Sequence, residues 1–224
     1  MSNFEVSNPI LSSPFEEPKE HWWILEGQMA ERREGRRPAL YFYRDPKRGA
    51  EERGGIAIEM RLVNEVRGRV KAWRDGGYAG VTRTTLELLQ HWRREGREDR
   101  KRLFFAQLEA VETIIFLVEA RPDYRQGIEI PRDEPGDDRK AEGFAGFVRY
   151  ACKMATGSGK TTVMGMVAAW SILNKVNDRS DGRFSEVVLV VVPNVTIRDR
   201  CHELDPERGE ASLYRTREIG RAHV

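Results

Sequence analysis

A short glycine turn constrains this chain more than any other feature of its sequence. Residues 157–159 read Gly-Ser-Gly and lead directly into Lys160 and Thr161. A stretch that favours a strand, residues 147–154, precedes the turn, and a helical pattern from 160 to 176 follows it. Strand, glycine turn and helix in this order are typical of a loop that binds phosphate groups. The sequence therefore predicts a phosphate site at the start of this helix.

Each residue type in the turn has a chemical reason to be there. Gly157 and Gly159 allow backbone conformations that are closed to other residues and let the chain approach a ligand closely. The backbone amides, with that of Ser158, can converge on phosphate oxygens at the positive end of the helix dipole. Lys160 would reach β- and γ-phosphates, and Thr161 would offer a hydroxyl to Mg²⁺. The alternative is a plain glycine turn beside a surface lysine.

Composition excludes several classes of protein. The chain has 224 residues, 38 basic and 36 acidic side chains, and a net charge of +2. Its longest apolar run is far shorter than a membrane-spanning helix requires, so we expect no membrane contact. The first residues lack the basic and apolar stretches of a signal peptide, so we expect none. Two cysteines, Cys152 and Cys201, cannot build a disulfide scaffold or a four-ligand zinc site. A cytoplasmic protein is the expectation.

Apolar spacing predicts the remaining elements. Residues 1–55 read as irregular but rich in aromatic rings, which either pack on a neighbouring core or form a stacking surface for bases. Helices are predicted over 56–73, 84–96 and 102–120, and a loop over 122–142. The β-branched run 186–193 predicts a strand buried on both faces of a parallel sheet. The fold class is therefore α/β, with parallel strands and flanking helices, behind a mostly helical and irregular amino-terminal region.

Two further segments are candidates for binding. Gln107 begins the third helix, and its amide could read an adenine edge because it donates and accepts at once. From spacing alone, an ordinary surface glutamine is the better supported alternative. Residues 193–200 follow the β-branched strand, where ligands gather in open α/β sheets. Thr196 could cap a new helix there and Arg198 could contact phosphate, and a plain turn with solvated arginines is the alternative.

These motifs together resemble one family. Residues 154–162 and 187–200 resemble motifs I and Ia of superfamily 2 helicases, and are closest to Res-subunit-like ATPases of type III restriction systems. Residues 107–114 resemble the upstream glutamine motif of that family, and residues 8–18 with His21 and Trp22 resemble its amino-terminal leader. One departure is Met154, which stands where the strict phosphate-loop pattern has glycine.

The resemblance implies a motor with two RecA-like lobes that hydrolyses ATP with Mg²⁺ and moves on DNA, with a modification methyltransferase as a possible partner. By position it assigns catalysis to Lys160 and Thr161, Mg²⁺ binding to Thr161, and contact with a DNA strand to Pro193, Thr196 and Arg198. The residues that it implies for ATP binding are Gln107, Thr156, Gly157, Ser158, Gly159, Lys160, Thr161 and Thr162.

The resemblance also sets expectations about what is missing. No Asp-Glu pair of the family's motif II follows Pro193, and neither a second lobe nor a nuclease domain is recognisable. Residues 218–224 are similar to one reading frame of a sequencing adapter. We therefore expect an accessory region over 1–100, a truncated first RecA-like domain over 101–217 and a non-native tail over 218–224. Such a chain would bind nucleotide only weakly, be inactive alone and be poorly soluble. The alternatives are a non-catalytic nucleic-acid-binding fragment or another phosphate-loop enzyme, such as a nucleotide kinase.

Overall fold

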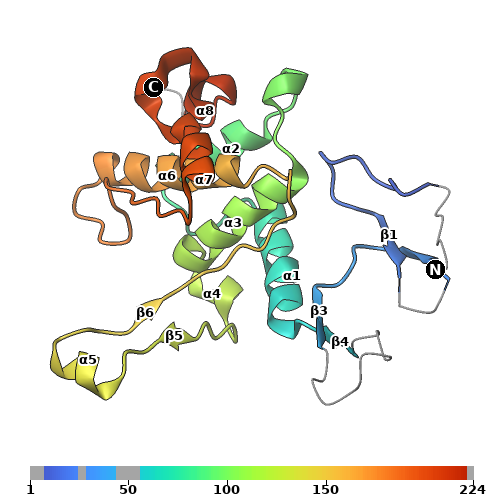
Figure 1. The fold of residues 1–224 in the computed structure, drawn as a ribbon, viewed down its shortest axis with the longest axis horizontal. Coiled ribbons are helices and arrows are strands. Elements are labelled where there is room, and N and C mark those ends of the chain that lie inside the picture. Colours follow the sequence, from blue (N-terminus) through green and yellow to red (C-terminus); the bar gives the residue numbers. More distant parts are fainter. Residues whose placement is uncertain (1–7, 25–28, 44–55, 221–224) are drawn as a thin grey trace.

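A bundle of four helices forms the centre of the protein. The computed structural model describes residues 8–24, 29–43 and 56–220. Helix α3 contacts each of the other three central helices, so it lies at the middle of the bundle (Figure 1). The four helices are α1 (Arg61–Asp75), α2 (Arg83–Arg93), α3 (Phe105–Glu119) and α6 (Lys160–Asn177).

The apolar face of α3 builds most of the core. Leu108, Val111 and Ile115, which follow the predicted helical spacing, are all buried. The Phe116 ring is wholly buried as well and meets the ring of Trp73 from α1 edge to face, with the ring centroids 5.5 Å apart. The prediction of a continuous helix over this segment is therefore confirmed, and the helix is buried on more than one side.

A single buried carboxylate joins three of these helices. Glu112 of α3 has no exposed surface, and its oxygens accept hydrogen bonds from Arg74 of α1 (2.7 and 2.9 Å) and from Arg93 of α2. The Tyr78 hydroxyl donates a third contact, of 2.7 Å. Burial alone would raise the pKa of the Glu112 carboxyl, but the hydrogen bonds and charges of Arg93 and Arg74 outweigh it and lower the pKa. The carboxylate is therefore ionised and fully paired.

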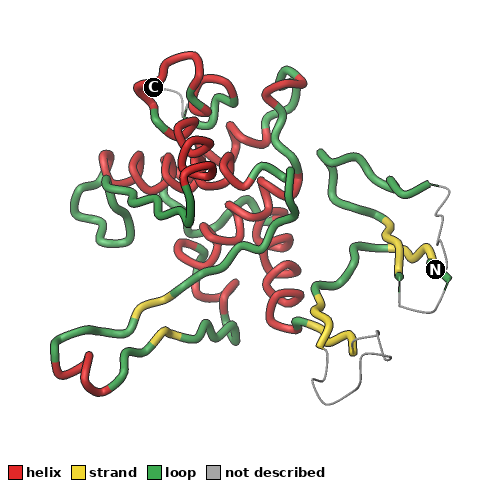
Figure 2. Tube along the Cα trace, viewed as in Figure 1, coloured by secondary structure: helices red, strands yellow, loops and turns green. Residues whose placement is uncertain are grey.

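The strands of the described residues form three separate antiparallel pairs rather than a parallel sheet (Figure 2). The combination of helices and strands that the sequence predicted is present, but the described strands do not form the expected parallel sheet. Residues 56–59 form a strand instead of the first turn of a helix. The region 1–55 was expected to be irregular, and its described residues, 8–24 and 29–43, contribute three strands. The pairs are β1 (Glu20–Trp23) with β2 (Glu31–Glu34), β3 (Leu40–Tyr43) with β4 (Ile56–Glu59), and β5 (Arg132–Asp133) with β6 (Phe147–Val148).

The largest correction concerns the β-branched run 186–193, which forms no strand. Val187, Leu189 and Val191 are 75%, 85% and 81% exposed. A strand buried on both faces needs partner strands on its edges and helices on its faces, and a two-stranded sheet is marginal in water. The other expected strand covers residues 147–154. Among the described residues only its first two, which form β6, are in a strand, and they pair with β5. The run therefore lacks a sheet to join.

The exposed run allows a direct test of this arrangement. We expect Leu189→Lys to leave the free energy of unfolding of the 224-residue chain unchanged within about 0.5 kcal/mol, because a solvent-facing side chain loses no packing. The substitution should also reduce aggregation, since it places a charge within an exposed β-prone segment. Urea unfolding and light scattering measure the two effects. A loss of several kcal/mol would show that the segment is buried in a sheet after all.

The carboxyl-terminal segment of the described chain packs back onto α2. Ile219 is wholly buried, and its carbonyl oxygen accepts a hydrogen bond of 2.9 Å from the Trp92 indole. A ring nitrogen of His91 lies 2.6 Å from the carbonyl oxygen of Glu218. The interpretation of 218–224 as a tail stays a prediction, and residues 221–224 lie outside the described residues.

Short elements complete the described chain. One arm, formed by β5, β6 and a short helix, extends away from the bundle, and the last helices lie over α6 (Figure 1). None of the helices in the described ranges is long and apolar enough to cross a membrane. The short elements are α4 (Pro122–Arg125), α5 (Asp137–Ala141), α7 (Val195–Cys201), α8 (Leu213–Thr216) and the 3-10 helices Asp99–Lys101, His202–Leu204 and Pro206–Ala211.

Candidate phosphate-binding site

The glycine turn contains two left-handed glycines and is closed by its own hydrogen bonds. Gly157 and Gly159 have φ values of +81° and +80°, in the left-handed region that side chains disfavour. The Ser158 amide and hydroxyl both donate to the Ala155 carbonyl oxygen, at 3.3 and 2.6 Å, which closes the turn. Gly159 is the cap of α6, so the 18-residue helix begins at Lys160, as the sequence predicts. The turn therefore presents the start of a long helix to solvent.

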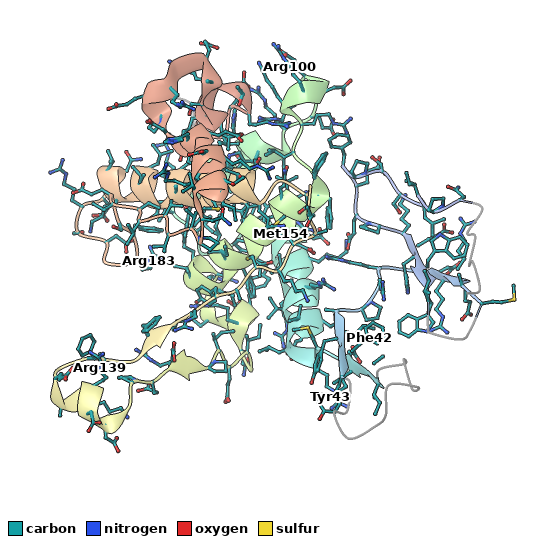
Figure 3. All side chains as sticks on the ribbon, viewed as in Figure 1. Phe42, Tyr43, Arg100, Arg139, Met154 and Arg183 are labelled. Atoms are coloured by element: carbon teal, nitrogen blue, oxygen red, sulfur yellow. The ribbon has the colours of Figure 1, made fainter. Side chains whose placement is uncertain are left out.

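The Lys160 ammonium folds back over this turn. It is exposed and donates to the carbonyl oxygens of Met154 (3.0 Å) and Ala155 (2.9 Å). Figure 3 labels Met154 on the irregular segment that leads into the loop. Neutral carbonyls are weaker partners for an ammonium than phosphate oxygens, because charge-assisted hydrogen bonds are about twice as strong. An anion in the turn would therefore compete with these two carbonyl oxygens for the ammonium.

Gln107 reaches the same turn from α3. Its side chain is buried, at 5% exposure, and its Oε1 accepts a hydrogen bond of 2.8 Å from the Phe104 amide. Its Nε2 lies so close to Gly159 that a Cβ on that glycine would overlap it. The structure therefore brings together two sites that are 52 residues apart in sequence, and the Gln107 amide faces the loop.

A cleft opens beside the start of α6. It has a volume of about 780 Å³ and includes Thr161 and Thr162 together with Gly159. Thr162 is buried and Thr161 is partly exposed, so the Thr161 hydroxyl is the more accessible to a bound ion. Thr156 lies on the exposed approach to the loop. The other residues along the cleft are Arg100, Lys101, Glu203, Glu210, Leu213, Tyr214, Arg215, Thr216, Arg217 and Glu218.

The far wall of the cleft is a set of charged residues that the sequence did not predict as a site. Four cations, at positions 100, 101, 215 and 217, and three carboxylates, at 203, 210 and 218, line it. Lys101 donates to Glu218 at 2.7 Å, and this contact links the two chain segments that form the wall. Lys101 also donates to the nearby Glu98 at 3.2 Å. No motif marks these residues, because the wall arises from chain segments about 115 residues apart that meet only in the fold.

The donor set of the loop fits a nucleotide phosphate. An exposed ammonium, two left-handed glycines and the start of a long helix all favour an anion, and the adjacent hydroxyl of Thr161 suits Mg²⁺. Metals have no other candidate site among the described residues, where no group of three His, Cys, Asp or Glu side chains is placed to bind one.

The predicted nucleic-acid residues lie elsewhere. Pro193, Thr196 and Arg198 are all exposed, on and just before α7, and none of them lines the cleft. The prediction that Thr196 caps this helix is wrong. Asn194 is the cap instead, and its Oδ1 accepts a hydrogen bond of 3.0 Å from the Ile197 amide. Arg198 lies 3.5 Å from the carboxylate of Asp199.

One comparison with known proteins covers the segment that contains this candidate site. The family model "Type III restriction enzyme, res subunit" matches residues 100–206, a range that includes Gln107, the glycine turn and α7. No curated protein and no solved structure matches the chain. Residues 100–206, a little under half of the chain, are therefore similar to the res subunits of type III restriction enzymes, a family related to the superfamily 2 helicases, as the sequence resemblance predicted.

Proposed function

We propose that this chain carries the ATP-binding part of a DNA-dependent ATPase or translocase of a type III restriction-like endonuclease, in a cytoplasmic setting. The observation that carries the proposal is the exposed Lys160 ammonium over a left-handed glycine turn at the start of α6, inside the segment that the family model matches. Nucleotide, Mg²⁺ and DNA are the ligands that this family implies.

In this proposal each loop residue has a separate task. The backbone amides of Gly157, Ser158 and Gly159 bind phosphate oxygens, Lys160 neutralises the β- and γ-phosphates, and Thr161 holds Mg²⁺. Bound Mg²⁺ would supply charge stabilisation at the phosphates. The supporting residues Thr156 and Thr162 flank the loop, and the adenine contact assigned to Gln107 stays part of the proposal.

DNA would meet a different surface. The supporting observation is that Pro193, Thr196 and Arg198 are exposed together around α7, where a phosphate backbone can reach them. A modification methyltransferase subunit is the proposed protein partner, by the same family relationship. We also propose that the chain alone does not turn over ATP, because no Asp-Glu pair follows Pro193 in its sequence.

Nucleotide titration tests the proposal. We expect Lys160→Ala to weaken ATP binding by about 10–100-fold, since a hydrogen bond to a charged group contributes about 1.5–3 kcal/mol. Lys153→Ala is the matched control, because Lys153 is an exposed lysine close to the loop in sequence, and its affinity should equal that of the wild type. Calorimetric titration with Mg-ATP measures both variants.

Three outcomes would contradict the proposal in different ways. Equal ATP affinity in the wild type and Lys160→Ala would remove the phosphate site. DNA binding without any nucleotide response would favour a non-catalytic nucleic-acid-binding module, and phosphate transfer to a small acceptor would favour a nucleotide kinase. Sustained DNA-stimulated hydrolysis that Lys160→Ala abolishes would refute the claim that the chain alone is inactive.

A further inference from the structure

The amino-terminal segment touches α3 at the residues where that helix begins. The Phe105 amide donates a hydrogen bond of 2.9 Å to the Pro14 carbonyl oxygen. The Phe15 ring packs on the Phe104 ring, with centroids 5.4 Å apart and planes tilted by 52°. The Arg102 guanidinium lies 4.0 Å from the centroid of the same Phe15 ring. The segment is therefore fixed to the start of α3 by a backbone hydrogen bond, an aromatic pair and a cation–π contact.

The same start of α3 orients the glutamine that faces the phosphate loop. Phe104 donates its amide to Gln107 Oε1 at 2.8 Å, which fixes the direction of the buried side chain. The opposite end of the Gln107 amide then lies against Gly159. Because Gly159 has no side chain and a left-handed backbone, its position depends on what packs against it. A continuous series of contacts therefore runs from Phe15 through Phe104 and Gln107 to the loop.

We propose that Phe15 is a positioning residue for the phosphate loop, which it holds in place through Phe104 and Gln107. Phe15 itself lines a separate depression beside Arg102 and is not part of the cleft at Thr161. It therefore acts on the loop without contacting the bound phosphates. The effect of Phe15 on nucleotide binding rests on the proposed function. The effect of Phe15 on the loop backbone does not depend on that function.

Other aromatic residues of the amino-terminal region offer a matched comparison. Tyr41, Phe42 and Tyr43 of β3 are about half exposed, and Figure 3 labels Phe42 and Tyr43 beside α1, away from the loop at Met154. Removing the Phe42 ring deletes a phenyl group of the same size from the same region. It leaves the contacts at Phe104 in place, so Phe42→Ala is the control for Phe15→Ala.

Hydrogen exchange of the loop tests the inference on the ligand-free protein. In Phe15→Ala we expect the amides of residues 155–163 to exchange about fivefold faster, the factor that corresponds to an aromatic pair of about 1 kcal/mol. Phe15→Tyr keeps the ring and should restore the wild-type rate, and Phe42→Ala should not change it. Exchange in α2 reports whether the variant is still folded. Equal loop exchange in Phe15→Ala and Phe42→Ala would overturn the inference.

Two ligands then separate loop positioning from recognition of the base. We expect Phe15→Ala to weaken binding of ATP and of inorganic triphosphate by the same factor, about fivefold. Gln107→Ala should also weaken both, and the double variant should bind no more weakly than Gln107→Ala, because Phe15 acts through Gln107. A loss confined to ATP would overturn the inference. If the wild type binds neither ligand, the proposed function fails and hydrogen exchange alone decides the inference.

Discussion

Replacing Glu112 with alanine is expected to lower the free energy of unfolding by about 3–5 kcal/mol. Removal of one partner of a buried ion pair leaves the other charges without compensation, and this costs more than the pair contributes. Arg74 and Arg93 would both lose their carboxylate, and the Tyr78 hydroxyl would lose its acceptor. Urea unfolding followed by tryptophan fluorescence measures the change, because Trp73 and Trp92 lie in the same core.

An exposed ion pair supplies the control for this effect. Glu65 pairs with Arg69 at 3.4 Å on the surface of α1, and Glu65→Ala should change stability by less than about 1 kcal/mol. Acid titration adds an independent check. Because the pKa of Glu112 is lowered in the folded state, its contribution is present above the ordinary value of 4.5 and is lost as the pH falls towards the lowered value. Equal losses in Glu112→Ala and Glu65→Ala would contradict the account of a buried, ionised carboxylate.

Gly159→Ala is expected to lower stability by about 2–5 kcal/mol and to abolish nucleotide binding. A left-handed backbone costs an alanine about 1–2 kcal/mol. The added methyl group would also displace the Gln107 amide and so leave the Phe104 amide without its acceptor, which costs about 1–3 kcal/mol more. Denaturant unfolding gives the stability, and titration with Mg-ATP gives the affinity.

A second left-handed glycine isolates the backbone cost. Gly77 has a φ of +80° and open space where a Cβ would lie, so Gly77→Ala measures the conformational strain alone. We expect Gly159→Ala to cost more stability than Gly77→Ala. In a Gln107→Ala background the two costs should be equal, because the overlap with the Gln107 amide then disappears. If the cost at Gly159 is the same in both backgrounds, the contact between Gln107 and the loop is not the cause.

The helices and the phosphate loop could be predicted from the sequence because their signals are local. The apolar spacing of 102–120 matches α3 to within a few residues, and the glycine turn leads into α6 at Lys160 as expected. Both follow from interactions between residues three or four apart, which propensity and spacing describe directly. The match of residues 100–206 to the res-subunit family was likewise predictable, since the motifs that suggested it are contiguous in the sequence.

The rest of the fold depended on partners that lie far away in the chain. The run 186–193 has the composition of a buried strand, but a strand exists only where another one pairs with it, and spacing cannot show whether a partner is available. The helix cap at Asn194 was missed because Thr196 is also a good capping residue and the two stand only two positions apart. Either residue type can cap a helix, and in the structure the cap is Asn194.

The contact between α2 and the residues after Arg217 has a consequence for the order in which the protein can form. Trp92 and its hydrogen-bond acceptor on Ile219 are 127 residues apart. Because synthesis proceeds from the amino end, a ribosome makes α2 long before the segment that covers it. Until then the Trp92 and His91 side chains lack this cover, and a chaperone that binds exposed apolar surface would find its target there. The core around Trp92 can thus be completed only after residue 219 has been made.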